Sequence, residues 1–171
     1  MSSSFLKVRI KNLCLFSIFK TCVRRHKPLR AMKPLGPIII VEDDKEDQEV
    51  LEEVFNDLQI ENEIKFFKEG NSVLAYLRTT TDKPFIIITD INMPMMNGLE
   101  LKMEIYKDEY LRKKSIPFVF LSTTDGSRII DKVYQLEVQG FFQKEFSYDS
   151  VRNQIKLIID YWSKCKHPNS Y

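Results

Sequence analysis

The sequence is short of cysteine, glycine and long apolar runs, and each shortage excludes a class of protein. Its 171 residues include three cysteines, five glycines and seven prolines. Cys14, Cys22 and Cys165 form no C-x-x-C pair and no cysteine/histidine array, so we expect neither a zinc site nor a disulfide framework, and a reducing cytoplasm as the setting. Low glycine and proline content excludes collagen-like chains. No apolar run approaches the ~20 residues that span a bilayer, so we expect a soluble globular protein.

Acidic residues are absent from residues 1–33, which hold nine of the 26 Lys and Arg residues. The other 17 basic residues stand against all 24 acids in residues 34–171, so the body of the chain is acidic. Three interpretations of the basic segment stay open: a targeting or membrane-surface peptide, a basic docking arm, or translated upstream sequence with the true start at Met32. We favour the last two over membrane contact, and expect an N-terminal extension over 1–33, one domain over 34–165 and a tail over 166–171.

Short apolar runs alternate with longer amphipathic stretches from Pro37 onward, a rhythm typical of βα units and a parallel sheet. The expected strands are 38–41, 64–67, 85–88, 117–121 and 140–143. The expected helices cover 46–58, 70–77 and 99–106, a fourth is marked by Ile129, Val133 and Leu136, and a fifth by Val151, Ile155, Ile158 and Trp162. The pattern predicts an α/β fold with a doubly wound, five-stranded parallel sheet flanked by five helices.

The run 99–106 is ambiguous because apolar and charged residues alternate there as they do in a half-buried strand. We predict a helix, because Glu, Lys, Leu and Met are strong helix formers and Asn97-Gly98 supplies a turn before it. Neighbouring parallel strands also need a crossover connection at this point of the chain.

Polar residues follow the ends of four predicted strands, where a parallel sheet forms its binding site. They are Glu42-Asp43-Asp44, Thr89-Asp90, Ser122-Thr123-Thr124 and Lys144. Carboxylates gathered in one pocket repel one another unless a cation neutralises them, and Mg²⁺ prefers such oxygen ligands. A carboxylate can attack phosphorus, and a lysine and a hydroxyl can hold the phosphoryl oxygens. No Gly-rich nucleotide-binding motif follows any strand, so the set points to a phospho-acceptor site.

Four motifs in this order resemble the receiver domain of response regulators over about residues 37–165. They are Val41-Glu42-Asp43-Asp44, the run Asp90 to Gly98 (DINMPMMNG), Leu121-Ser122-Thr123, and Gly140-Phe141-Phe142-Gln143-Lys144. The pattern D-x-x-M-P-x-M-x-G is quite specific, and the acidic pair precedes it by about fifty residues. The resemblance implies the flavodoxin-like receiver fold.

The resemblance also implies a phosphorylation site with bound Mg²⁺. Asp90 corresponds to the phosphorylated aspartate and is itself a metal ligand. Asp43 corresponds to a direct metal ligand, with Glu42 acting through a metal-bound water. Asn92 would offer its backbone carbonyl to the metal, and Asp44 would be a spare acid.

The remaining matched positions are those that bind the phosphoryl group and respond to it. Ser122 corresponds to the hydroxyl residue that binds a phosphoryl oxygen, and Lys144 to the lysine that pairs with the group. Phe141 corresponds to the switch aromatic that turns inward when the hydroxyl moves. The resemblance then implies a change in the face made by the fourth helix, the fifth strand and the fifth helix.

One residue departs from the family pattern, since Glu145 stands where a proline usually follows the lysine, often through a cis bond. A non-prolyl cis peptide costs ~3–4 kcal/mol, so we expect a bond that is either trans or strained. Lys144 is expected to stay in the site, beside the competing anion of Glu145.

Our first hypothesis is a cytoplasmic single-domain response regulator of a two-component phosphorelay. Asp90 would accept a phosphoryl group from a sensor histidine kinase or a histidine phosphotransfer protein, and the altered face would bind an output protein that the sequence does not identify. The chain ends soon after the last expected helix, so we expect no DNA-binding or enzymatic output domain. The protein would be a switch rather than an enzyme, with self-catalysed loss of its aspartyl phosphate.

Two other hypotheses stay open. One is a phosphorylation-independent receiver fold that docks on a kinase or scaffold. The other is an enzyme that hydrolyses small phosphate esters, which is weaker because Ile91 and Asn92 stand where a second acid would serve as general acid or base.

Overall fold

The computed structural model describes residues 36–123 and 127–166. The predictions for the extension 1–33, for Thr124 and for all but the first residue of the tail lie outside these residues. None of the helices within the described ranges is long and apolar enough to cross a membrane.

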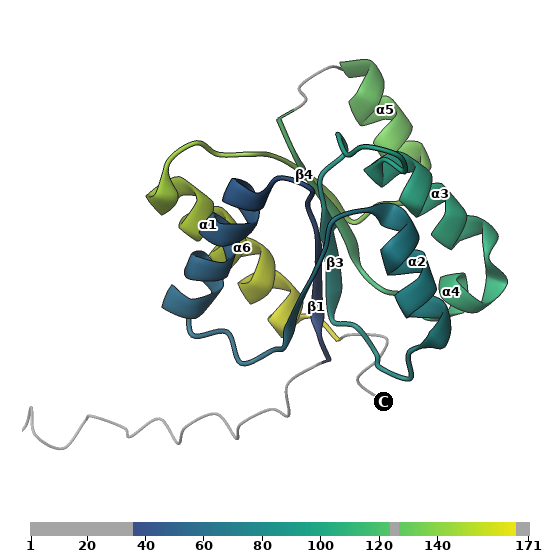
Figure 1. The fold of residues 1–171 in the computed structure, drawn as a ribbon, viewed down its shortest axis with the longest axis horizontal. Coiled ribbons are helices and arrows are strands. Elements are labelled where there is room, and N and C mark those ends of the chain that lie inside the picture. The colour runs from purple at the N-terminus through teal and green to yellow at the C-terminus, as the bar shows by residue number, and fades with distance from the viewer. Residues whose placement is uncertain (1–35, 124–126, 167–171) are drawn as a thin grey trace, which may run out of the picture. The chain divides into compact units, whose positions relative to one another are not determined.

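Five parallel strands form one sheet in the order β2-β1-β3-β4-β5 (Figure 1). The strands are β1 (Ile38–Val41), β2 (Ile64–Phe67), β3 (Ile86–Thr89), β4 (Phe118–Ser122) and β5 (Gly140–Gln143). The order turns back between β1 and β3, which is the doubly wound arrangement that the sequence predicts. β1, β3 and β4 are buried along their whole length because helices cover both faces of the sheet.

The crossover helices lie on both sides of the sheet, with α1 and α6 on one face and α2, α3 and α5 on the other (Figure 1). Their bounds are α1 (Lys45–Asp57), α2 (Gly70–Thr79), α3 (Gly98–Lys107), α5 (Ser127–Gln135) and α6 (Tyr148–Lys164). The helix predicted over the ambiguous run is confirmed as α3. It begins with a capping box, in which the Asn97 side chain accepts from the Glu100 N–H and the Glu100 carboxylate accepts from the Asn97 N–H.

The prediction of five helices was wrong, because the described residues contain a sixth, α4 (Glu109–Lys113). Asp108 ends α3 and at once caps α4, since its Oδ1 accepts from the N–H groups of Tyr110 and Leu111. Leu111 is the buried residue of this helix and joins the core. Five residues with a single buried position are too short to show a helical period in the sequence.

The core consists of two apolar layers, one on each face of the sheet. Alternate residues of β1 supply both, since Ile39 and Val41 pack toward α2, α3 and α5 while Ile38 and Ile40 pack toward α1 and α6. Both layers are closed to solvent along the central strands. The polar residues that follow these strands are therefore held at a rigid edge.

Gly98, the first residue of α3, lies against the backbone of Asp90. A Cβ at this position would stand 2.2 Å from the Asp90 carbonyl oxygen and 3.0 Å from a ring carbon of Phe120. The Gly98 N–H also donates to the Ile91 carbonyl oxygen at 3.1 Å. The loop between β3 and α3 therefore closes tightly only because residue 98 lacks a side chain.

Gly98→Ala should lower the free energy of unfolding by about 2 kcal/mol, because the methyl group displaces backbone and cannot be relieved by a rotamer change. Gly70→Ala is the matched control, since its Cβ would meet only the flexible Met96 side chain; it should change stability by no more than about 1 kcal/mol. Urea denaturation followed by circular dichroism measures both. Equal effects of the two substitutions would contradict the tight closure at Gly98.

Candidate functional site

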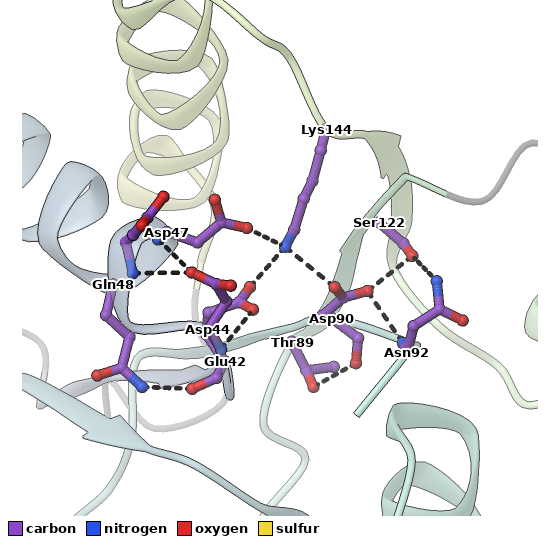
Figure 2. Close-up of polar contacts among 10 residues, drawn as sticks. Glu42, Asp44, Asp47, Gln48, Thr89, Asp90, Asn92, Ser122 and Lys144 are labelled. Carbon is purple, nitrogen blue, oxygen red and sulfur yellow. Dashed lines mark hydrogen bonds and ion pairs between the residues drawn. The ribbon is translucent and has the colours of Figure 1, made fainter. Parts of the chain in front are cut away.

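The carboxyl ends of four strands bring the predicted polar residues to one edge of the sheet (Figure 2). The strand ladder continues one residue beyond the strands, since Asp90 N–H donates to the Val41 carbonyl at 3.0 Å and Lys144 N–H to the Ser122 carbonyl at 2.9 Å. Backbone pairing thus sets the positions of Asp90 and Lys144, and Ser122 is the last residue of β4.

Asp90 is buried and both of its carboxylate oxygens have partners. Its Oδ1 accepts from the Ser122 hydroxyl at 2.7 Å and from the Asn92 N–H at 3.0 Å, while its Oδ2 lies 3.0 Å from the Lys144 ammonium. Burial by itself would raise the pKa of Asp90, but these donors outweigh it and hold the pKa below its usual value. Asp90 is therefore an ionised carboxylate in a site largely shielded from water.

The ammonium group of Lys144 is shared by three carboxylates. It lies 2.7 Å from Glu42 Oε2, 2.6 Å from Asp47 Oδ2 and 3.0 Å from Asp90 Oδ2 (Figure 2). Burial favours loss of its proton, but the hydrogen bonds to Asp47 and Glu42 outweigh that effect and raise the pKa of Lys144. Lys144 therefore remains charged and links β1, α1 and β3 to the end of β5.

Glu42 is the most deeply buried acid of this cluster, with 3% of its surface exposed. Burial raises its pKa to about 7, against the opposing effect of Lys144 and with the charges of Asp90 and Asp47 adding to the rise. The Gln48 amide donates to the Glu42 carbonyl and fixes the turn into α1. When Glu42 is ionised, three carboxylates face one ammonium and two negative charges lack compensation; when Glu42 is protonated, one does.

This uncompensated negative charge bears on whether the site suits the expected Mg²⁺ ion. Carboxylate oxygens with an excess of one to two negative charges match the chemistry of a divalent cation such as Mg²⁺. Among the described residues, however, no group of three acidic, His or Cys side chains is arranged so as to hold a metal ion, although Glu42, Asp47 and Asp90 converge on Lys144. Asp43 is exposed beside Glu42. The donor types fit Mg²⁺, and the Lys144 ammonium lies among these carboxylates.

The other predicted acid, Asp44, caps a helix. Its Oδ1 accepts from the N–H groups of Glu46 at 2.8 Å and Asp47 at 3.1 Å, at the start of α1. This cap directs the first turn of α1 toward the site, and so positions Asp47.

The bond that follows Lys144 is trans, since the described residues contain no cis peptide bond. This settles the alternative that the sequence left open for the Lys144–Glu145 bond. Glu145 is exposed, and the lysine reaches Asp90 across the trans bond.

Phe141 lies on β5, three residues before Lys144. It is paired in register with Phe120 of β4, and Phe120 lies two residues before Ser122. Its half-buried ring packs against the core layer on the side of α3 and α5.

Figure 2 shows that Asn92 also reaches Ser122, with its Nδ2 at 3.4 Å from the hydroxyl oxygen.

Sequence reasoning missed Asp47, which makes the shortest of the three contacts with Lys144. It also missed Gln48, the neighbour that holds the Glu42 carbonyl. Asp47 lies in the first turn of α1, five residues after Glu42. An acid one helical turn beyond the strand-end acids was the available signal.

Comparison with known proteins places this arrangement in one family. Residues 38–156 match the family described as the response regulator receiver domain. Response regulator Rcp1 from Synechocystis sp. is 26% identical over 134 residues, which cover 75% of this chain and 90% of that protein.

Solved structures agree with this match. The phosphorylated cyanobacterial phytochrome response regulator RcpA superposes with a TM-score of 0.71 at 28% identity, over 78% of this chain and 98% of that one. The Mn²⁺-bound form of Rcp1 gives a TM-score of 0.69 at 25% identity, over 78% and 99%. The order of the strands, the acidic edge and the family match over most of the chain agree, and this chain belongs to the response regulator receiver domain family.

Proposed function

We propose that this receiver domain takes a phosphoryl group onto Asp90 from the phosphohistidine of a sensor histidine kinase or a phosphotransfer protein. The observation that carries the proposal is the Asp90 carboxylate itself, which is buried and ionised and is held by Ser122, Asn92 and Lys144. Phosphorylated RcpA and Mn²⁺-bound Rcp1, two structures of the same family, support it.

The transfer forms an oxygen–phosphorus bond at Asp90 and breaks the nitrogen–phosphorus bond of the donor, whose imidazole nitrogen leaves with the electron pair. Phosphoryl transfer needs mainly positioning and charge neutralisation. Lys144 supplies a positive charge beside Asp90 Oδ2, and the Ser122 hydroxyl and the Asn92 amide supply donors on the other side. Mg²⁺, held by Asp43, Asp90 and the Asn92 carbonyl with Glu42 nearby, would neutralise the phosphoryl oxygens.

A switch follows from the hydrogen bond between Ser122 and Asp90. Once Asp90 carries a phosphoryl group, the Ser122 hydroxyl would turn to a phosphoryl oxygen; Ser122 lies two residues after Phe120, whose register partner on β5 is Phe141. An inward turn of Phe141 then changes the face formed by α5, β5 and α6. The expected fourth and fifth helices correspond to α5 and α6, because α4 was not expected, so this is the same face that the sequence predicts.

The same face carries exposed aromatic and aliphatic side chains. Tyr134 is 57% exposed, and Leu157 and Tyr161 are each 60% exposed. Together with Phe141 they line a hollow of about 320 Å³. Exposed apolar groups gathered in this way are typical of protein interaction sites, so an output protein would dock here.

The exposed face also favours the second candidate function, a receiver fold that docks without phosphorylation, because it is accessible in the unphosphorylated protein. The two functions differ in one requirement. Only the first needs a reactive carboxylate at residue 90.

Incubation with acetyl phosphate and Mg²⁺ should label the protein, and Asp90→Ala should abolish the label because the accepting carboxylate is lost. Asp44→Asn is the matched control, since it removes an exposed acid of the same cluster and keeps the helix cap. Intact-mass spectrometry measures the addition. A labelled alanine variant, or an unlabelled wild-type protein, would leave the docking function as the better account.

Lys144→Gln should bind Mg²⁺ more tightly than the wild-type protein, by about tenfold, because the competing ammonium is gone and three carboxylates remain. Its labelling by acetyl phosphate should be much slower, since the positive charge beside Asp90 is lost. Isothermal titration calorimetry and the mass assay measure the two effects. Lys156→Gln, which removes an exposed lysine of α6, should change neither.

Weaker Mg²⁺ binding in the Lys144→Gln protein would show that the lysine does not compete with the metal for the carboxylates.

A further inference from the structure

A second cleft lies at the opposite edge of the sheet from Asp90. It has a volume of about 360 Å³ and extends below the amino ends of β4 and β5. Pro117 and Gln139, the residues just before these two strands, form part of its wall, and α3, α4, α6 and the loops that precede β4 and β5 contribute the rest. Its apolar lining includes Ile105, Leu111, Ile116 and Trp162.

Lys102 of α3 lines this cleft although only 8% of its surface is exposed. Its ammonium lies 5.2 Å from the centre of the Phe118 ring, and within the described residues it has neither a hydrogen bond nor an ion pair. Burial lowers the pKa of Lys102, and only the more distant charge of Glu137 opposes that effect. The stem of Lys102 is therefore buried, while its charged end is not sealed off and remains accessible from the cleft.

The charges around the cleft favour an anion. Arg112 of α4 stands at its rim, with its guanidinium 5.8 Å from the centre of the Tyr106 ring, and Glu137 is the single acid among the lining residues. The net charge of the lining is therefore positive. The lining is mixed, since charged and polar side chains stand beside apolar ones, and the volume is that of a small-molecule site.

We propose that this cleft binds a small organic anion, a carboxylate or phosphate group on an aromatic or aliphatic body. The anionic group lies on the Lys102 ammonium with Arg112 at the rim, and the body packs against Ile105, Ile116 and Trp162. The site is separate from Asp90 and does not depend on phosphorylation.

Trp162 provides a direct measurement, because it is the only tryptophan of the chain and lines the cleft. Titration of the full chain with phenyl phosphate and with phenylacetate should produce a saturable change in tryptophan fluorescence. Benzyl alcohol, which has the ring without the charge, should bind about tenfold more weakly or not at all, since it cannot form the charge-assisted hydrogen bond. The two anions distinguish a phosphate from a carboxylate preference.

Two variants assign the anion to Lys102. Lys102→Met keeps the length of the buried stem and should weaken binding of the preferred anion about tenfold or more. Glu137→Gln, an exposed substitution, should strengthen it because a competing negative charge is removed. Lys107→Met, on an exposed position of α3, is the matched control and should bind as the wild-type protein does.

The proposal would be overturned by an absence of saturable binding of both anions, by equal binding of benzyl alcohol, or by unchanged affinity in Lys102→Met. Weaker binding in Glu137→Gln would also contradict it, and this variant keeps the test decisive if Lys102→Met fails to fold. Anion binding should persist in Asp90→Ala. A failure of the anion-binding proposal can therefore be told apart from a failure of the phosphorylation proposal.

Discussion

The arrangement of the site depends on one ammonium group. Lys144 neutralises carboxylates from the end of β1, the first turn of α1 and the end of β3, all within 3.0 Å. Without it, three acids would face one another in a mostly buried pocket and would be driven apart or protonated. Because one positive charge does not balance the acids around it, the chemistry of the pocket suits a divalent cation. Burial is the main cause of the raised pKa of Glu42, and the negative charges of Asp90 and Asp47 add to it.

The backbone explains why these groups meet. Buried strands of Ile, Val and Phe hold β1, β3 and β4 in register, so each residue that follows a strand has a set position. Gly98 allows the loop after Asp90 to close against its carbonyl. The motif around Asp90 therefore contains both the candidate phospho-acceptor and the glycine, Gly98, that lets its loop close.

Much of this could be predicted from the sequence, because strand periodicity and strand-end chemistry are local signals. The five strands, α3 and the meeting of Asp90, Ser122 and Lys144 are of this kind. Asp47 was missed although it lies one helical turn beyond the strand-end acids, and its contact with Lys144 spans 97 residues of the chain. The helix α4 could not be predicted, since it has a single buried position. In the sequence, Lys102 is one of the charged residues that alternate with apolar ones over 99–106. Only the packing of α3 near Phe118 shows that Lys102 is buried.

The central claim is that Asp90 is the residue that carries the phosphoryl group. The most direct measurement is phosphotransfer from a purified phosphohistidine donor, followed by borohydride reduction, which converts an aspartyl phosphate to homoserine, and peptide sequencing by mass spectrometry. The account predicts homoserine at residue 90 alone. Homoserine at another acid of the cluster, such as Asp43 or Asp47, would contradict it.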